Sequence, residues 1–198
     1  MRVGYIAADL KHPLDQAVVA ALPGLGAIPV EIKLPDLPYE ALQHLLFAEG
    51  AAAFEEMTLS GADDALARQD DGAWPNSFRK ARFLSAVDHI QLDRLRRRVM
   101  QAMDAVFREV DVLLGPLEHG PLTIIGNMTG HPALAVRTGF EMKRTRQMPA
   151  FLNAQVVEAE GPEFAVPHAI SVLAPLFDEA AALRLGRVLE VTGRVPEL

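Results

Sequence analysis

The chain has 198 residues, of which half are apolar and 23% are charged, and it contains no cysteine. This composition is typical of a globular protein, and it excludes disulfides, thiolate metal sites and a cysteine nucleophile. A net charge of −7 argues against nucleic-acid binding, and no apolar run reaches the roughly 18 residues of a membrane span. We therefore expect a cytoplasmic protein that binds neither nucleic acid nor a membrane.

The N-terminal region predicts a strand–helix–strand unit. Residues 2–8 form a short apolar run, and Pro13 then stands where a helix favours its first residue. Residues 28–34 alternate between apolar and polar side chains, and Pro29 places this strand at a sheet edge. Gly24-Leu-Gly26 follows the helix rather than preceding it, so these glycines do not predict a nucleotide-binding loop.

The next region predicts helices and a polar connection. A second helix is expected from Pro38 to about Met57 because leucines and alanines recur at helical spacing. Residues 60–76 turn polar and predict a short helix and a loop, whose paired aspartates are interpreted as solvated carboxylates. Trp74 is the only tryptophan, and we expect it to anchor this loop in the core.

Residues 83–109 predict the largest element, a long helix with one apolar stripe. The stripe consists of Val87, Ile90, Leu95, Val99, Met103 and Val106. The opposite face is charged, and its arginines are expected to pair with acidic residues three or four positions away rather than with phosphates.

Three short apolar runs, bounded by glycine and proline, predict buried strands at residues 111–115, 132–137 and 168–174. Residues 141–166 are polar and predict either a hairpin or a mobile lid, and a last helix begins near Asp178. The expected fold is a single α/β domain over residues 1–198, a mixed sheet of four to five strands flanked by helices.

Three motifs in one order resemble the C-terminal portion of the amidase signature family. They are Asp111-Val-Leu-Leu-Gly-Pro116, Asn127-Met-Thr-Gly-His-Pro-Ala-Leu-Ala-Val-Arg-Thr-Gly-Phe140 and Phe177-Asp-Glu179. The resemblance implies the C-terminal half of an amidase-signature-like fold. It also implies that the complete enzyme hydrolyses amide C–N bonds with a Ser–Ser–Lys triad and a glycine- and serine-rich loop.

That catalytic region has no counterpart in this sequence. The chain contains no Gly-Gly and no Gly-Ser dipeptide, and its only serines are Ser60, Ser77, Ser85 and Ser171. None of its four lysines lies in an apolar strand that would favour a neutral amine. We therefore assign no catalytic residue, and we expect a C-terminal part of an amidase that is inactive alone. The alternative is a non-enzymatic binding or assembly module derived from the same fold.

The substrate-pocket candidates lie around the second motif. They are Asn127, Thr129, Gly130, His119 and His131. Asn and Thr side chains fix tight turns through their own backbone, and Gly130 is expected to adopt a positive φ, so a structural role for this turn competes with substrate contact. The six histidines lack metal-binding spacing, so neither a metal nor another cofactor is expected.

The missing half of the resemblance also predicts how the chain assembles. A fold that lacks its first half exposes apolar strand edge or helix face, which favours pairing with another chain. We expect a homo-oligomer or a partner chain, and a small-molecule amide substrate only when an N-terminal half complements this one.

Overall fold

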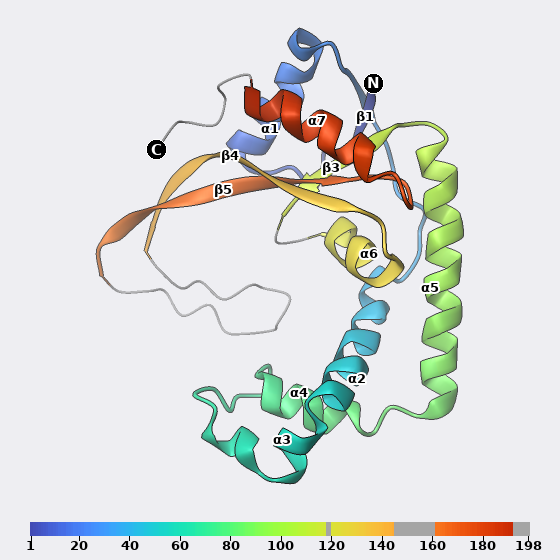
Figure 1. Cartoon of the computed structure of the whole chain (residues 1–198), viewed down its shortest axis with the longest axis vertical. Helices are drawn as coiled ribbons and strands as arrows, with labels where there is room; N and C mark the ends of the chain where they lie inside the picture. The colour runs from blue at the N-terminus through green and yellow to red at the C-terminus, as the bar shows by residue number, and fades with distance from the viewer. Residues whose placement is uncertain (118–119, 145–160, 192–198) are drawn as a thin grey trace.

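The computed structural model describes residues 1–117, 120–144 and 161–191, and its centre is a five-stranded mixed sheet of order β2-β1-β3-β5-β4 (Figure 1). The strands are β1 (Arg2–Tyr5), β2 (Ile28–Glu31), β3 (Val112–Pro116), β4 (Ala133–Arg144) and β5 (Glu163–Leu173). β1 is parallel to β2 and β3, whereas β5 is antiparallel to β3 and β4. The predicted mixed sheet with flanking helices is confirmed.

The parallel part of the sheet contains the predicted strand–helix–strand unit, β1–α1–β2. Helix α1 (Pro13–Ala21) begins at Pro13, and the Nδ1 atom of its N-cap, His12, accepts a 3.2 Å hydrogen bond from the backbone N–H of Leu14. β2 is an edge strand, as Pro29 predicts. β1 is shorter than predicted because the carbonyl of Ile6 accepts the N–H of Asp9 and turns the chain.

Helices cover both faces of this sheet, and neighbouring residues of β3 show the division. Val112 and Leu114 face α1 and α7 (Glu179–Val191), whereas Leu113 faces α5 (Ala86–Phe107) and α6 (Pro121–Thr129). All three side chains are fully buried. Each burial of this kind stabilises the fold by about 2 kcal/mol, so β3 contributes to the packing of both helix layers.

A separate group of helices lies away from the sheet and is called here the helical lobe, residues 43–90 (Figure 1). Its elements are α2 (Gln43–Ala53), α3 (Glu55–Leu59), η3 (Ala62–Ala65), α4 (Trp74–Ala81) and the first turn of α5, and η2 (Tyr39–Leu42) leads into it. The predicted helix from Pro38 to Met57 is interrupted at Phe54, whose backbone leaves the helical region.

Trp74 does not anchor a loop in the core, and that prediction is wrong. It is the first residue of α4, is more than one-third exposed, and packs at the lobe surface against Phe47 and Phe78. Pro75 explains the difference, because proline in the first turn of a helix favours initiation as readily as it favours a loop.

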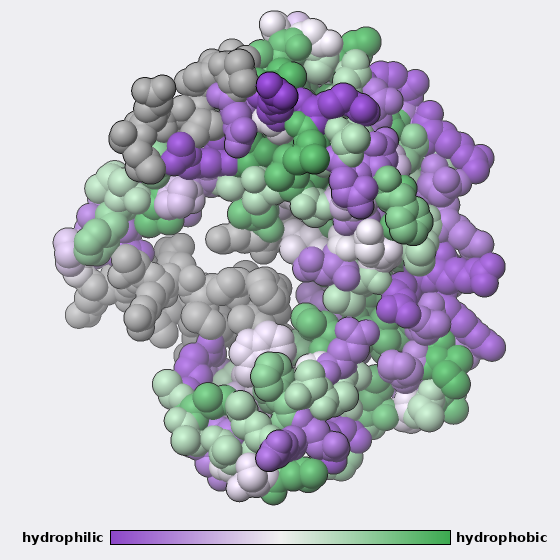
Figure 2. Space-filling model, viewed as in Figure 1, coloured by the Kyte–Doolittle hydropathy of each residue, from purple (hydrophilic) through white to green (hydrophobic). Residues whose placement is uncertain are grey.

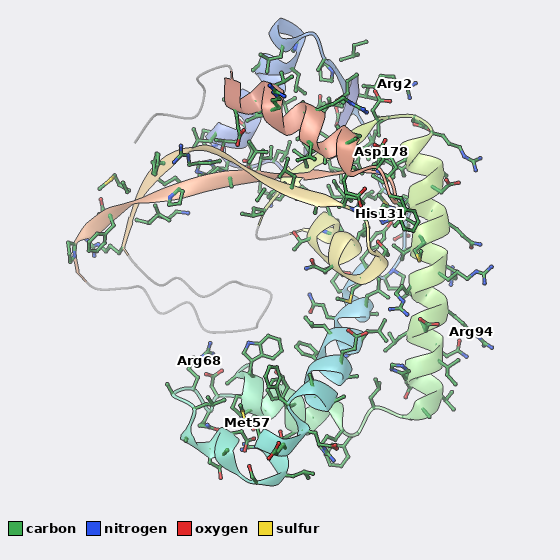
Figure 3. All side chains as sticks on the ribbon, in the orientation of Figure 1. Arg2, Met57, Arg68, Arg94, His131 and Asp178 are labelled. Atoms are coloured by element: carbon green, nitrogen blue, oxygen red, sulfur yellow. The ribbon has the colours of Figure 1, made fainter. Side chains whose placement is uncertain are left out.

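Helix α5 is the predicted long helix, and Ser85 caps it by accepting the N–H of Asp88. Only the C-terminal part of the predicted stripe is buried, from Val99 onwards, whereas Val87 and Ile90 are 66% and 52% exposed. Hydrophilic residues crowd along the outer side of α5, where Arg94 points outward (Figures 2 and 3). Two ion pairs at the expected spacing form on α5, Arg96–Asp93 and Arg108–Asp104, so the pairing predicted for its charged face is confirmed in part.

The segment after β3 is a helix, α6, whereas the sequence predicts a tight turn at Asn127 and Thr129. Pro121 occupies its first turn, and Gly130 ends it at φ +77°, which confirms the positive φ expected there. Its nine residues include Gly126, where a Cβ would lie 2.9 Å from the side chain of Leu173. This close approach needs a glycine inside a helix, which weakens the helical signal in the sequence.

β4 and β5 extend well beyond the predicted strands. They pair as far as Arg144 and Glu163, with an irregularity between Arg137 and Gly139, so the described part of 141–166 is the hairpin alternative. Residues 145–160 lie outside the described residues. None of the described helices is long and apolar enough to cross a membrane.

Candidate functional site

A crevice lies at the carboxyl ends of the parallel strands. The chain leaves β1 towards α1 on one face, whereas it leaves β2 and β3 towards η2 and α6 on the other. Such a divergence opens a ligand-binding crevice in open α/β sheets. Here its volume is about 330 Å³, and its walls come from the segments after β1, β2 and β3, namely Ile6, Asp9, residues 34–37, Tyr39, Glu40 and Pro121.

The charged residues that line this crevice are all acidic. Burial, followed by the nearby carboxylates of Asp36 and Glu40, raises the pKa of Tyr39 above its ordinary value. The phenol therefore stays protonated and donates a 2.5 Å hydrogen bond to the carbonyl of Pro35. The described lining residues of the crevice offer the carboxylates of Asp9, Asp36 and Glu40 but no serine, lysine or histidine, so they do not supply the serine and lysine of the expected triad.

The predicted pocket residues lie at the end of α6 and do not line this crevice. Asn127 and Gly130 are exposed, whereas Thr129 and His131 are buried. His119 lies outside the described residues. His131 sits between α6 and α5, where its ring stacks on Phe107 (Figure 3).

Thr129 and His131 form a closed hydrogen-bonded pair. The hydroxyl of Thr129 donates to the carbonyl of Ile125 at 2.5 Å, so the 2.6 Å contact from its oxygen to Nδ1 of His131 requires the ring to donate. Burial lowers the pKa of His131 below its ordinary value. The ring is therefore held neutral with its proton on Nδ1, which suits a structural link better than proton transfer.

A second groove, of about 810 Å³, is lined by residues of η2, α2 and α4, and a serine and a lysine both face it. Ser77 and Lys80 lie one turn apart on α4, and both line this groove. Lys80 donates to the carbonyl of Asp71 at 2.6 Å and lies 3.5 Å from its carboxylate. Both contacts direct the amine of Lys80 to Asp71, whereas a lysine that activates a serine must hydrogen-bond to that serine.

A third feature is a cluster of ionisable side chains that the sequence patterns did not indicate. His12, Glu141 and His168 offer potential metal-ligand atoms within 4.8 Å of one another. They come from α1, β4 and β5, so only the fold brings them together. Asp15, which is 1% exposed, contacts His168 from the other side.

The fold resembles part of an amidase fold. A structure described as an amidase superposes with a TM-score of 0.70 at 18% identity, over 96% of this chain and 45% of that chain. Fatty acid amide hydrolase superposes with a TM-score of 0.71 at 16% identity, over 98% of this chain and 40% of that chain. A third similar structure is an inhibitor-bound vestigial protein complex that reveals the evolutionary origins of an s-triazine catabolic enzyme. It superposes with a TM-score of 0.67 at 20% identity, over 98% of this chain and 43% of that chain.

This chain therefore spans less than half the length of each of these similar proteins. No family model and no curated protein matches the sequence. At these sequence identities the similarity shows a shared fold only. The activities of the three proteins are therefore not assigned to this chain here.

Proposed function

We propose that this chain is the C-terminal part of an amidase-family hydrolase, which cleaves amide C–N bonds only when the rest of the fold completes it. The supporting observation is the match of nearly all of this chain to less than half of each amidase-like structure. The order of the three sequence motifs supports assignment to the C-terminal portion. The triad and the oxyanion-binding loop would then lie in the complementary part.

The surface of the helical lobe supports a need for a partner. Phe83, Val87 and Ile90 expose 90%, 66% and 52% of their surface, and the last two lie about one turn apart on α5. Exposed large apolar side chains on one helix face are typical of an interaction site. We propose that the occupant is the chain or segment that carries the remaining part of the amidase fold.

The buried and exposed pocket candidates have different proposed roles. Thr129 and His131 hold the end of α6 through their mutual hydrogen bond. Asn127 and Gly130 are exposed beside them and are the members of the set available to contact a substrate in the completed enzyme. His119 stays a candidate from the sequence alone.

Hydrolysis assays with the purified chain test this proposal. Aliphatic and aromatic amides should show no turnover, because loss of a complete triad removes about a millionfold in rate in a well-studied serine hydrolase. Ser60→Ala, Ser77→Ala, Ser85→Ala and Ser171→Ala should change nothing, and Lys80→Met is a matched control for the groove. Turnover that one of these substitutions abolishes would overturn the proposal.

The alternative is a non-enzymatic assembly module, and the same apolar surface of the lobe favours it equally. A complementation assay separates the two. The chain is mixed with a protein that carries the remaining part of the fold, identified by a glycine- and serine-rich segment encoded in frame or in a neighbouring gene. Restored amide hydrolysis supports the hydrolase, whereas a stable complex without turnover supports the assembly module.

A further inference from the structure

The ionisable cluster lies where helix α1 contacts the β4–β5 hairpin (Figure 1). The register of the two strands makes Glu141 and His168 diagonal neighbours on one face of this antiparallel pair. Gly139 lies opposite His168 on the same face, and a Cβ there would meet the side chain of Leu14 at 2.9 Å. The start of α1 therefore packs beside both ionisable side chains of the hairpin.

The ligand atoms of this cluster lie at separations that suit one metal ion. Nδ1 of His168 lies 2.6 Å from Oε1 of Glu141, and Nε2 of His12 lies 3.1 Å from Oε2 of the same carboxylate. The three residues place their ligand atoms within 4.8 Å of one another. Ligand atoms about 2.1 Å from a zinc ion lie about 3.4 Å apart at the tetrahedral angle. Small movements of these side chains are therefore enough to surround an ion.

Asp15 fixes the orientation of the His168 ring. Its side chain is 1% exposed, and Oδ1 lies 2.8 Å from Nε2 of His168. A carboxylate accepts the hydrogen bond from Nε2–H, so Nδ1 presents its lone pair to Glu141. A histidine that donates one N–H to a carboxylate and offers its other nitrogen to an ion is the usual arrangement around zinc. Two acceptors that face each other at 2.6 Å also call for a cation between them.

His12 supplies the second imidazole by exchanging one contact for another. Its Nδ1 accepts a 3.2 Å hydrogen bond from the N–H of Leu14, which is at the long end of the usual range. An ion bound through Nε2 places the ring proton on Nδ1, so this bond is lost and the N–H of Leu14 turns to water. The ring also leaves its stack on His168, and it has room to move because 31% of the side chain is exposed.

The charges around the cluster suit a divalent cation. Asp15 and Glu141 bring two carboxylates from α1 and β4, and one divalent ion balances them when both imidazoles are neutral. The ammonium of Lys143 lies 3.1 Å from Oε2 of Glu141 and competes with the ion for this oxygen. The Lys143 side chain is 43% exposed, so it can withdraw into solvent when the ion binds.

We propose that His12, Glu141 and His168 bind one divalent transition-metal ion of the Zn²⁺ type, with Asp15 as the residue that positions His168. Two imidazoles and a carboxylate are a ligand set that zinc uses, and the partly exposed side chains leave a fourth position to water. The ion ties α1 to the β4–β5 hairpin. The sequence predicts no metal because these ligands come from three elements and lack motif spacing.

Isothermal titration calorimetry of the metal-free chain with Zn²⁺ tests the site, and one ion per chain is expected. Asp15→Asn should weaken binding by about 10- to 100-fold, as loss of a partner behind a ligand does. His12→Asn removes a ligand but keeps a side chain that caps α1, and it should weaken binding further. Lys143→Gln removes the competing ammonium and should tighten binding. His89→Gln, at an exposed histidine of α5, is the matched control and should change nothing.

The backbone amide of Leu14 reports the ion at His12 directly. Its hydrogen exchange should accelerate when Zn²⁺ binds, because the bond to Nδ1 is lost, whereas an ion elsewhere on the chain leaves it unchanged. Circular dichroism checks that each variant is folded, and His12→Asn and Lys143→Gln lie at partly exposed positions. Absence of Zn²⁺ binding would overturn the proposal, as would an affinity that survives both His12→Asn and His168→Gln. An equal loss of affinity in His89→Gln would overturn it too.

Discussion

The sheet and the helical lobe bury their apolar residues to very different extents. In the sheet, adjacent residues of β3 are fully buried against helices on both faces, and β5 contributes Ile170 and Val172 to the same core. In the lobe, Leu45 and Phe78 are buried, but Phe83 and the start of α5 expose large apolar surface. The sheet region therefore closes a core between helices on both faces, although Phe177 and Leu183 are also 90% and 59% exposed there, whereas the lobe has few fully buried residues of its own. We propose that a partner covers the lobe.

The largest loss of stability is expected from a substitution in the sheet core. Leu114→Ala should lower the free energy of unfolding by about 3 kcal/mol, because a fully buried leucine leaves a cavity between β3 and the α1–α7 layer. Phe83→Ala removes a larger side chain from the lobe surface and should cost nearly nothing. Urea unfolding monitored by circular dichroism checks both. A loss at Phe83 as large as that at Leu114 would show that the lobe is already covered in the isolated chain.

A smaller effect is expected inside the lobe, where an ion pair supplements the apolar packing. Asp63 is 1% exposed and lies 2.8 Å from Arg79. Arg79→Met leaves the buried carboxylate without this partner and should destabilise the lobe by about 2 kcal/mol. Arg108→Met, at an exposed pair with Asp104, is the matched control and should have little effect. Equal effects would argue that Asp63 is solvated.

The smallest effect concerns pH and the junction between α6 and α5. Burial lowers the pKa of His131, so the unfolded chain binds this proton more readily than the folded one. The stability that the neutral ring of His131 gives to the folded chain is fully present above about pH 6.5 and is lost as the pH falls below it. His131→Gln should reduce this acid-side loss in melting-temperature profiles. An unchanged profile would mean that the ring is accessible to water.

The contrast between the regions also explains what the sequence could predict. Short apolar runs such as 111–115 identify strands because burial on both faces needs continuous hydrophobicity. Helix α6 was not predicted because it contains Gly126, which the close contact with Leu173 requires and which lowers the helix propensity of the segment. The contact between Asp15 and His168 was not predicted because the two residues are 153 positions apart and meet only where helix α1 packs on the sheet. The proposed pocket residues were chosen in and just before one motif, whereas the crevice is lined by residues that follow three different strands.

Sedimentation velocity of the purified chain at tens of micromolar, the order at which exposed apolar surface drives association, tests the central claim most directly. We expect a dimer or a complex with a co-purified chain, and Val87→Glu with Ile90→Glu should shift the chain to a monomer while its circular dichroism spectrum is unchanged. A clean monomer of the parent chain at that concentration would contradict the claim that the helical lobe is built to be covered by a partner.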